Sequence, residues 1–163
     1  MRLALYQPDI PQNTGAMLRF AACTGISVDI IEPCGFLLDD RKLRRAGMDY
    51  LDHVAVTRHV SWDRFAESHQ NSGNRLILLT TRAATPYPEF EFATDDTVLV
   101  GRESAGVPDD VHRAADARLL IPMVEGVRSL NVALSAAMVM GEALRQTGGF
   151  TRPHAIPQQE EQP

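Results

Sequence analysis

The sequence has few of the residues that build metal centres, and it has no long apolar run. Its two cysteines, Cys23 and Cys34, do not have the spacing of paired metal ligands, and its five histidines are scattered. No run approaches the roughly 18 apolar residues that a membrane-spanning helix needs. The apolar start meets Pro8 and Asp9 too early to form the core of a signal peptide. We therefore expect no metal, no membrane attachment and a reducing cytoplasmic setting.

Positive charge is also scarce. The 163 residues carry a formal net charge of −5, which argues against broad electrostatic binding of nucleic acid. The exception is a short basic run, whose members are Arg41, Lys42, Arg44 and Arg45. Considered alone, this run is best interpreted as the solvated face of a helix that begins at two aspartates, Asp39 and Asp40.

Hydrophobic residues make up 44% of the chain, enough for a real core, and short apolar runs alternate with helical patterns. Strands are predicted at residues 3–6, 28–31, 53–57, 76–80, 97–100 and 119–121. Helices are predicted at 13–24, at 39–45, from a cap at Ser61, at 108–115 and at 130–146, with glycines as stops at Gly25 and Gly148. The continuous apolar runs at 76–80 and 97–100 are typical of parallel strands covered on both faces. The pattern predicts one α/β domain over residues 1–150, with a mostly parallel sheet and helices on both faces, and a flexible tail over 151–163.

Polar residues and glycines gather after predicted strands, where open α/β sheets bind ligands. The first such cluster, at residues 8–15, leads into Arg19. Asn13 is expected to cap the helix that follows. This cluster alone is better explained by a capped helix with one exposed arginine.

The second cluster, at residues 100–108, contains Gly101, Glu103 and Gly106 before Pro108. Glycines there would let backbone amides approach a ligand closely. The cluster is not the glycine fingerprint of dinucleotide-binding folds, and it lacks the lysine of a phosphate-binding loop. A tight structural turn remains the alternative.

The third cluster runs from Ile121 to Asn131, between a predicted strand and the longest predicted helix. Ser129 is the expected helix cap, whereas Asn131 is unusual inside a helix. The helix that follows is apolar almost all round, so we expect it to be buried within one subunit or between two.

These three clusters, in this order, resemble the three motifs of the SpoU/TrmH branch of the SPOUT methyltransferases. The matching segments are Asn13-Thr14-Gly15 with Arg19, Gly101 with Glu103, Gly106 and Pro108, and Ile121-Pro122-Met123 with Ser129-Leu130-Asn131, followed by Glu142 and Arg145-Gln146. Within that branch the start of the chain, residues 6–15, and the segments 31–36 and 43–50 are similar to the minimal TrmL (YibK-like) group.

The resemblance implies a SPOUT fold with a C-terminal trefoil knot, acting as a homodimer. It implies methyl transfer from S-adenosylmethionine to the ribose 2′-hydroxyl of the wobble nucleotide, a cytidine or modified uridine, in leucine tRNAs. The implied cofactor-binding residues are Leu79, Thr80, Gly101, Ile121, Ser129 and Leu130. The implied catalytic residues are Asn13, Arg19, Glu103, Ser129 and Asn131, with part of the pocket coming from the second subunit.

The resemblance also changes the interpretation of the basic run at residues 41–45, whose side chains become candidate phosphate contacts on the anticodon stem-loop. Two alternatives stay open. One is an RNA-binding or assembly protein that keeps this fold without turnover, and the other is a nicotinamide-dependent enzyme, disfavoured by the missing glycine fingerprint.

Overall fold

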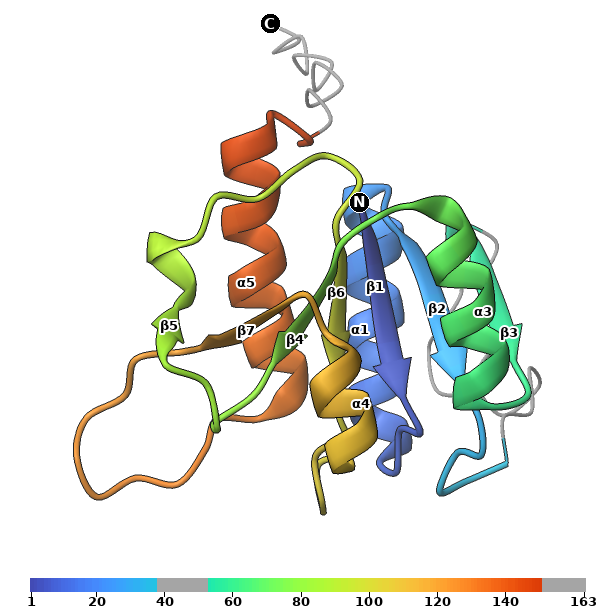
Figure 1. Ribbon diagram of the computed structural model, residues 1–163, viewed down its shortest axis with the longest axis horizontal. Coiled ribbons are helices and arrows are strands. Elements are labelled where there is room, and N and C mark those ends of the chain that lie inside the picture. Colours follow the sequence, from blue (N-terminus) through green and yellow to red (C-terminus); the bar gives the residue numbers. More distant parts are fainter. Residues whose placement is uncertain (38–52, 151–163) are drawn as a thin grey trace, which may run out of the picture.

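The computed structural model describes residues 1–37 and 53–150, and within these ranges the strands form a single parallel sheet (Figure 1). The strand order is β3-β2-β1-β6-β4-β7-β5, and every neighbouring pair is parallel. The strands are β1 (Arg2–Tyr6), β2 (Ser27–Ile31), β3 (Val56–His59), β4 (Leu76–Leu79), β5 (Thr85–Pro86), β6 (Thr97–Val100) and β7 (Ala117–Leu120). The predicted parallel α/β architecture is confirmed.

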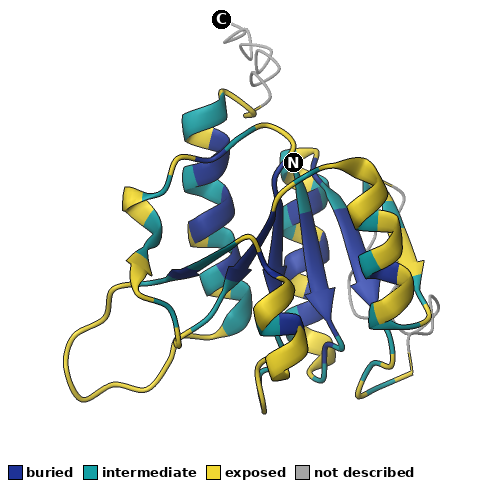
Figure 2. Ribbon diagram, viewed as in Figure 1, coloured by how far each residue is buried: buried dark blue, intermediate teal, exposed yellow. Residues whose placement is uncertain are grey.

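Helices cover both faces of this sheet. They are α1 (Pro11–Thr24), α3 (Trp62–Ser72), α4 (Asp109–Ala114) and α5 (Val132–Thr147), with a 3-10 turn, η2, at Tyr87–Glu89. Successive strand residues point to opposite faces, so Leu3 and Leu5 pack with α1 and α5, whereas Ala4 packs on the side of α3 and α4. Between these two helix layers, β1, β2, β4 and β6 are buried almost throughout (Figure 2). Burial on both faces explains their continuous apolar sequences.

The start of α1 differs from the prediction. The helix begins at Pro11, and its N-cap is Ile10, which makes no side-chain cap, so the expectation that Asn13 is the cap is wrong. Proline suits the first helical position because its fixed φ matches the helix and its missing N–H would be unpaired there in any case. The side chain of Asn13 is therefore left for other contacts. The predicted stop is confirmed, because Gly25 has φ 73° and donates its N–H to the carbonyl of Ala21.

The start of α5 also differs. The cap is Asn131, whose Oδ1 accepts the N–H of Ala133 at 2.9 Å and that of Leu134 at 3.2 Å, so the expectation that Ser129 is the cap is wrong. Residues 122–131 before the helix are all exposed. The helix is buried on one side only, since Leu134 is 60% and Met138 42% exposed.

Two further strands differ from the prediction by a few residues at their ends. The third and last predicted strands are shifted to Val56–His59 and Ala117–Leu120, and the two-residue β5 was not predicted. The cap at Ser61 is confirmed, since its side chain accepts the N–H of Arg64. The predicted helix at 39–45 lies outside the described residues. The parallel sheet with helices on both faces agrees with the α/β fold that the resemblance implies, and the knot itself stays a prediction of the resemblance.

Candidate functional site

The predicted clusters meet at one edge of the sheet. Strands β1, β6, β4 and β7 are adjacent and parallel, so the segments that follow them leave the sheet at the same edge, the lower one in Figure 1. The first cluster follows β1, the second follows β6 and the third follows β7. Their convergence places polar side chains and glycines at the carboxyl ends of the strands, where parallel sheets bind ligands.

An open cleft of about 830 Å³ lies there, between these strand ends and the exposed loop of residues 121–131. This loop projects from the body of the molecule (Figure 1). All six residues expected to bind the cofactor line the cleft: Leu79, Thr80, Gly101, Ile121, Ser129 and Leu130. Three of the expected catalytic residues, Glu103, Ser129 and Asn131, line it as well.

The wall formed by the second cluster is a tight turn. Arg102 and Gly106 exchange two backbone hydrogen bonds, of 3.0 and 2.8 Å, and Gly106 has φ 65°. A Cβ on Gly101 would lie 2.6 Å from the carbonyl carbon of Gly106, so no other residue fits there without moving the backbone. The structural turn and the candidate ligand loop are therefore the same feature.

Three side chains from the three clusters form a continuous hydrogen-bonded row. The Asn13 amide donates to the carboxylate of Glu103, and the Asn131 amide donates to Oδ1 of Asn13 at 2.9 Å. Each is a side-chain contact between residues at least 90 positions apart. The row fixes the edge of the cleft where the second and third clusters meet α1.

Sequence reasoning did not single out Asp9, which fastens the turn of the second cluster. Its carboxylate accepts the backbone N–H of Glu103 at 3.1 Å and that of Ser104 at 3.2 Å, and also the Ser104 hydroxyl. Partial burial alone would raise the pKa of Asp9, but hydrogen bonds from Ser104 and the Glu103 backbone outweigh it and hold that pKa below its usual value. The only signal for Asp9 in the sequence was an acidic residue close to two prolines, Pro8 and Pro11.

Arg19 does not reach this cleft within its own chain. It is exposed on α1, and it is not among the described residues that line the cleft. It lies six residues after Asn13, which at about 100° per residue turns it well away from the face that carries Asn13. The candidate RNA contacts Arg41, Lys42, Arg44 and Arg45 lie outside the described residues.

The residues that follow the third motif, Glu142, Arg145 and Gln146, do not line the cleft. Gln146 accepts the N–H of Phe92 at 2.9 Å and donates to the carbonyl of Phe90 at 3.0 Å, which ties α5 to the chain between β5 and β6. The hydrogen bonds from Arg145 and Gln146 lower the pKa of Glu142 to about 2. Glu142, Arg145 and Gln146 therefore lie at the C-terminal end of α5, away from the cleft, where Gln146 supports the fold.

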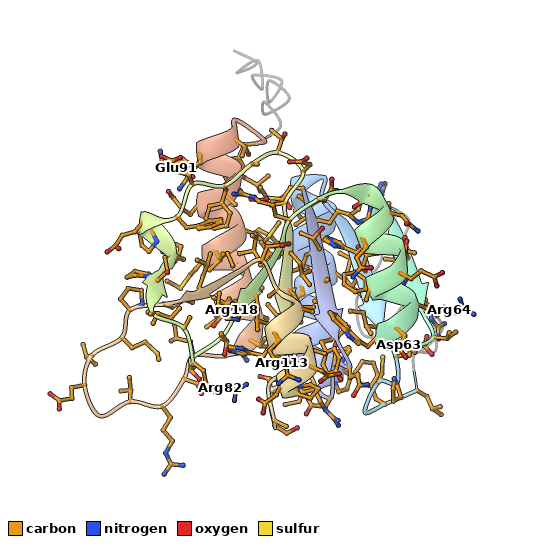
Figure 3. The ribbon with its side chains drawn as sticks, in the orientation of Figure 1. Asp63, Arg64, Arg82, Glu91, Arg113 and Arg118 are labelled. Carbon is orange, nitrogen blue, oxygen red and sulfur yellow. The ribbon has the colours of Figure 1, made fainter. Side chains whose placement is uncertain are left out.

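Arg113 lies on α4, and Arg82 and Arg118 lie beside that helix (Figure 3). Arg118 donates to the carbonyls of His112 and Arg113, at the end of that helix, and Arg82 pairs with Asp109 at 3.1 Å.

Over residues 1–37 and 53–150, no group of three or more His, Cys, Asp or Glu side chains could hold a metal ion. No helix in the same ranges is long and apolar enough to cross a membrane.

A parallel sheet with an open cleft at the carboxyl ends of its strands places the protein in the class of ligand-binding α/β proteins. Comparison with known proteins identifies the family within that class. Residues 1–141 match the model of the SpoU rRNA Methylase family. A Beijerinckia indica protein named tRNA (cytidine(34)-2'-O)-methyltransferase is 59% identical over 150 residues, which cover 92% of this chain and 94% of that one. The chain belongs to the SpoU rRNA Methylase family.

Solved structures agree with this assignment. One that concerns 2-OH methylation of C/U34 on tRNA is 41% identical, with a TM-score of 0.82 and coverage of 89% of both chains. The SpoU methyltransferase AviRb from Streptomyces viridochromogenes, solved in complex with the cofactor AdoMet, has a TM-score of 0.78 at 23% identity. It covers 90% of this chain and 57% of that chain, and this likeness shows the fold.

Proposed function

We propose that this protein transfers a methyl group from S-adenosylmethionine to the ribose 2′-hydroxyl of nucleotide 34, a cytidine or modified uridine, in leucine tRNAs. One observation carries the proposal: the Asn131–Asn13–Glu103 row borders a cleft lined by every residue expected to hold the cofactor. The names of the relatives at 59% and 41% identity support the same reaction and the same nucleotide.

The cleft suits this cofactor chemically. Its volume of about 830 Å³ lies within the roughly 300–1,000 Å³ typical of small-molecule sites. Leu79, Ile121 and Leu130 offer apolar surface to an adenine ring, and Gly101 leaves its backbone open. When bound, S-adenosylmethionine supplies an electrophilic methyl group, so the protein's task is mainly alignment.

The remaining task is to position the acceptor hydroxyl and assist loss of its proton. Glu103 and Ser129 line the cleft as polar groups that can receive hydrogen bonds from the ribose. Arginine remains protonated at neutral pH, so we assign Arg19 to binding phosphate and stabilising the forming alkoxide. Because Arg19 lies outside the cleft of its own chain, we propose that it acts in the cleft of a second subunit.

A homodimer also explains the exposed side of α5. Leu134 and Met138 are 60% and 42% exposed, and Ile10, just before α1, is 40% exposed. Since α1 and α5 pack against each other, these apolar side chains offer a surface that a second copy would cover. The dimer would meet its tRNA substrates in the cytoplasm.

The anticodon stem-loop would be held by the basic run at residues 41–45. In a chain with net charge −5, this run is the main concentration of positive charge in the sequence. Reversing the charges of Arg44 and Arg45 should weaken tRNA binding and flatten its dependence on salt. An unchanged salt slope would assign the run to an ordinary solvated surface.

The deciding experiment supplies the purified protein with labelled S-adenosylmethionine and leucine tRNA transcripts, and maps the product by mass spectrometry. We expect one methyl group on nucleotide 34, and no transfer to a transcript that carries 2′-deoxyribose at that position. Methylation elsewhere would overturn the assigned nucleotide. Tight tRNA binding without transfer would favour the alternative of a non-catalytic RNA-binding protein.

A further inference from the structure

We propose that Asp9 is a positioning residue for the methyl transfer, which acts by holding the backbone of Glu103 at the edge of the cleft. The inference rests on the proposed function for its link to catalysis. Its structural part, the control of one turn by one carboxylate, stands on the contacts alone.

The contacts of Asp9 are concentrated on two consecutive residues. Its two carboxylate oxygens accept the N–H of Glu103 at 3.1 Å, the N–H of Ser104 at 3.2 Å and the hydroxyl of Ser104. The guanidinium of Arg102 lies farther away, with Nε 4.0 Å from the carboxylate. The two backbone amides and the Ser104 hydroxyl are therefore the main partners of Asp9.

Asp9 is itself held from the other side. The N–H of Gly35 donates to the carbonyl of Pro8 at 2.9 Å. A Cβ on Gly35 would lie 2.9 Å from both Cα and Cβ of Asp9, so the two segments are in direct contact. The N–H of Gln7 donates to Ile31 at the end of β2, at 2.8 Å. Asp9 thus connects the rigid ends of β1 and β2 to the turn after β6.

Glu103 is consequently fixed at two points. Asp9 holds its backbone N–H, and the Asn13 amide holds its carboxylate, which leaves little freedom for the side chain between them. A carboxylate that must meet a ribose in one orientation gains from such double support, since small misplacements in an active site slow reactions strongly. Asp9 is not among the described residues that line the cleft, so we expect its effect to pass through Glu103.

The test compares Asp9→Asn with the wild-type protein. An amide has a single acceptor oxygen and would turn its NH₂ toward donors, so it cannot satisfy all three. We expect single-turnover methyl transfer to slow by about tenfold, with the affinity for S-adenosylhomocysteine nearly unchanged. Asp63→Asn, on exposed α3 (Figure 3), is the matched control and should leave the rate unaltered.

A double-mutant comparison distinguishes positioning from general damage. If Asp9 acts through Glu103, Asp9→Asn combined with Glu103→Gln should be no slower than Glu103→Gln alone. Rate losses that multiply in the double variant would overturn the proposal.

Amide hydrogen exchange separates this inference from the proposed function. The amides of Glu103 and Ser104 should exchange at least several-fold faster in Asp9→Asn, whether or not the wild-type protein methylates tRNA. Faster exchange with an unchanged rate of transfer would refute the catalytic role of Asp9. A wild-type protein without transfer would defeat the proposed function while leaving the structural contact confirmed.

Discussion

The side-chain amide of Asn131 donates to Oδ1 of Asn13 at 2.9 Å, and the same asparagine uses its own Oδ1 to cap α5. One residue thus starts the last helix and joins it to the first, across 118 positions of sequence. The two roles use different atoms, so they can be separated experimentally.

Replacing Asn131 by Asp should preserve the cap and remove the donor to Asn13. Aspartate is a good N-cap, so we expect stability within about 0.5 kcal/mol of the wild type, while methyl transfer falls. Asn131→Ala removes both contacts and should cost about 1 kcal/mol of stability as well. Urea unfolding and transfer rates measure the two effects. Equal activity of Asn131→Asp and the wild type would show that the bond to Asn13 has no catalytic importance.

Gly101→Ala tests the tight turn after β6. Its new Cβ would lie 2.6 Å from the Gly106 carbonyl carbon, so we expect a loss of about 2 kcal/mol or more together with weaker binding of S-adenosylhomocysteine. The comparison is Gly106→Ala, which has open space around the new Cβ but keeps φ 65°, and should cost about 1 kcal/mol. Chemical unfolding and calorimetry give the values. A well-tolerated Gly101→Ala would contradict the described turn.

Gln146→Ala tests the tie between α5 and the chain between β5 and β6. The variant leaves the N–H of Phe92 and the carbonyl of Phe90 without their side-chain partner. Loss of a partner for partly buried groups costs about 1–3 kcal/mol. Gln70→Ala, on the exposed face of α3, is the control and should change unfolding free energy by less than about 0.5 kcal/mol. Similar stability of the two variants would argue against the tie.

Lowering the pH should remove the extra stability that the ionised carboxylate of Asp9 gives the wild-type protein over Asp9→Asn. The unfolding free energies of the two proteins, compared at each pH, measure this contribution. Because folding lowers the pKa of Asp9 below 3.8, its ionised form stabilises the fold fully above that value, and the contribution is lost as pH falls through the folded pKa. The difference in unfolding free energy between wild type and Asp9→Asn should therefore be constant from pH 5 upward, in the plateau about one unit above the unfolded pKa, and shrink below it. A difference that grows on acidification would reverse the assigned sign.

Dimer formation should depend on the exposed apolar side of α5. Leu134→Glu places a charge on a side chain that is 60% exposed in the single chain. We expect the dimer to dissociate in ultracentrifugation without loss of the fold, since the new charge would be solvated in the single chain and buried without a partner only in the interface. Val60→Glu, at the 75% exposed Val60 after β3, is the matched control. A dimer that survives Leu134→Glu would place the interface elsewhere.

The shared site can be tested by mixing two inactive variants. If Arg19 acts in the partner's cleft, Arg19→Ala and Asn131→Ala subunits should restore activity together, because each mixed dimer contains one complete site. Random mixing predicts about a quarter of the wild-type rate. Mixed dimers without activity would return Arg19 to the cleft of its own chain.

Local signals in the sequence were sufficient for much of the fold. The apolar run at 97–100, the cap at Ser61 and the stop at Gly25 all lie where they were predicted, because strand burial, capping and left-handed glycine turns depend on a few neighbouring residues. The ordered clusters also indicated the family, whose membership the comparisons confirmed.

Contacts between segments that are distant in the sequence could not be predicted from these local signals. The sequence offers Asn13 and Ser129 as helix caps, yet Pro11 begins α1 and Asn131 caps α5. That choice becomes clear only when the strand order brings the two helix starts together and gives Asn13 and Asn131 each other as partners. The role of Asp9 was hidden for the same reason, because its partners follow β6.

The sequence by itself therefore determined the element types, the buried strands and the family of this protein. Only the tertiary structure decided which polar side chains share the edge of the cleft, and it placed Arg19 outside the cleft of its own chain. The physical reason is range: helix and strand signals are read within a few residues, whereas the Asn131–Asn13–Glu103 row depends on the order in which β1, β6, β4 and β7 pair.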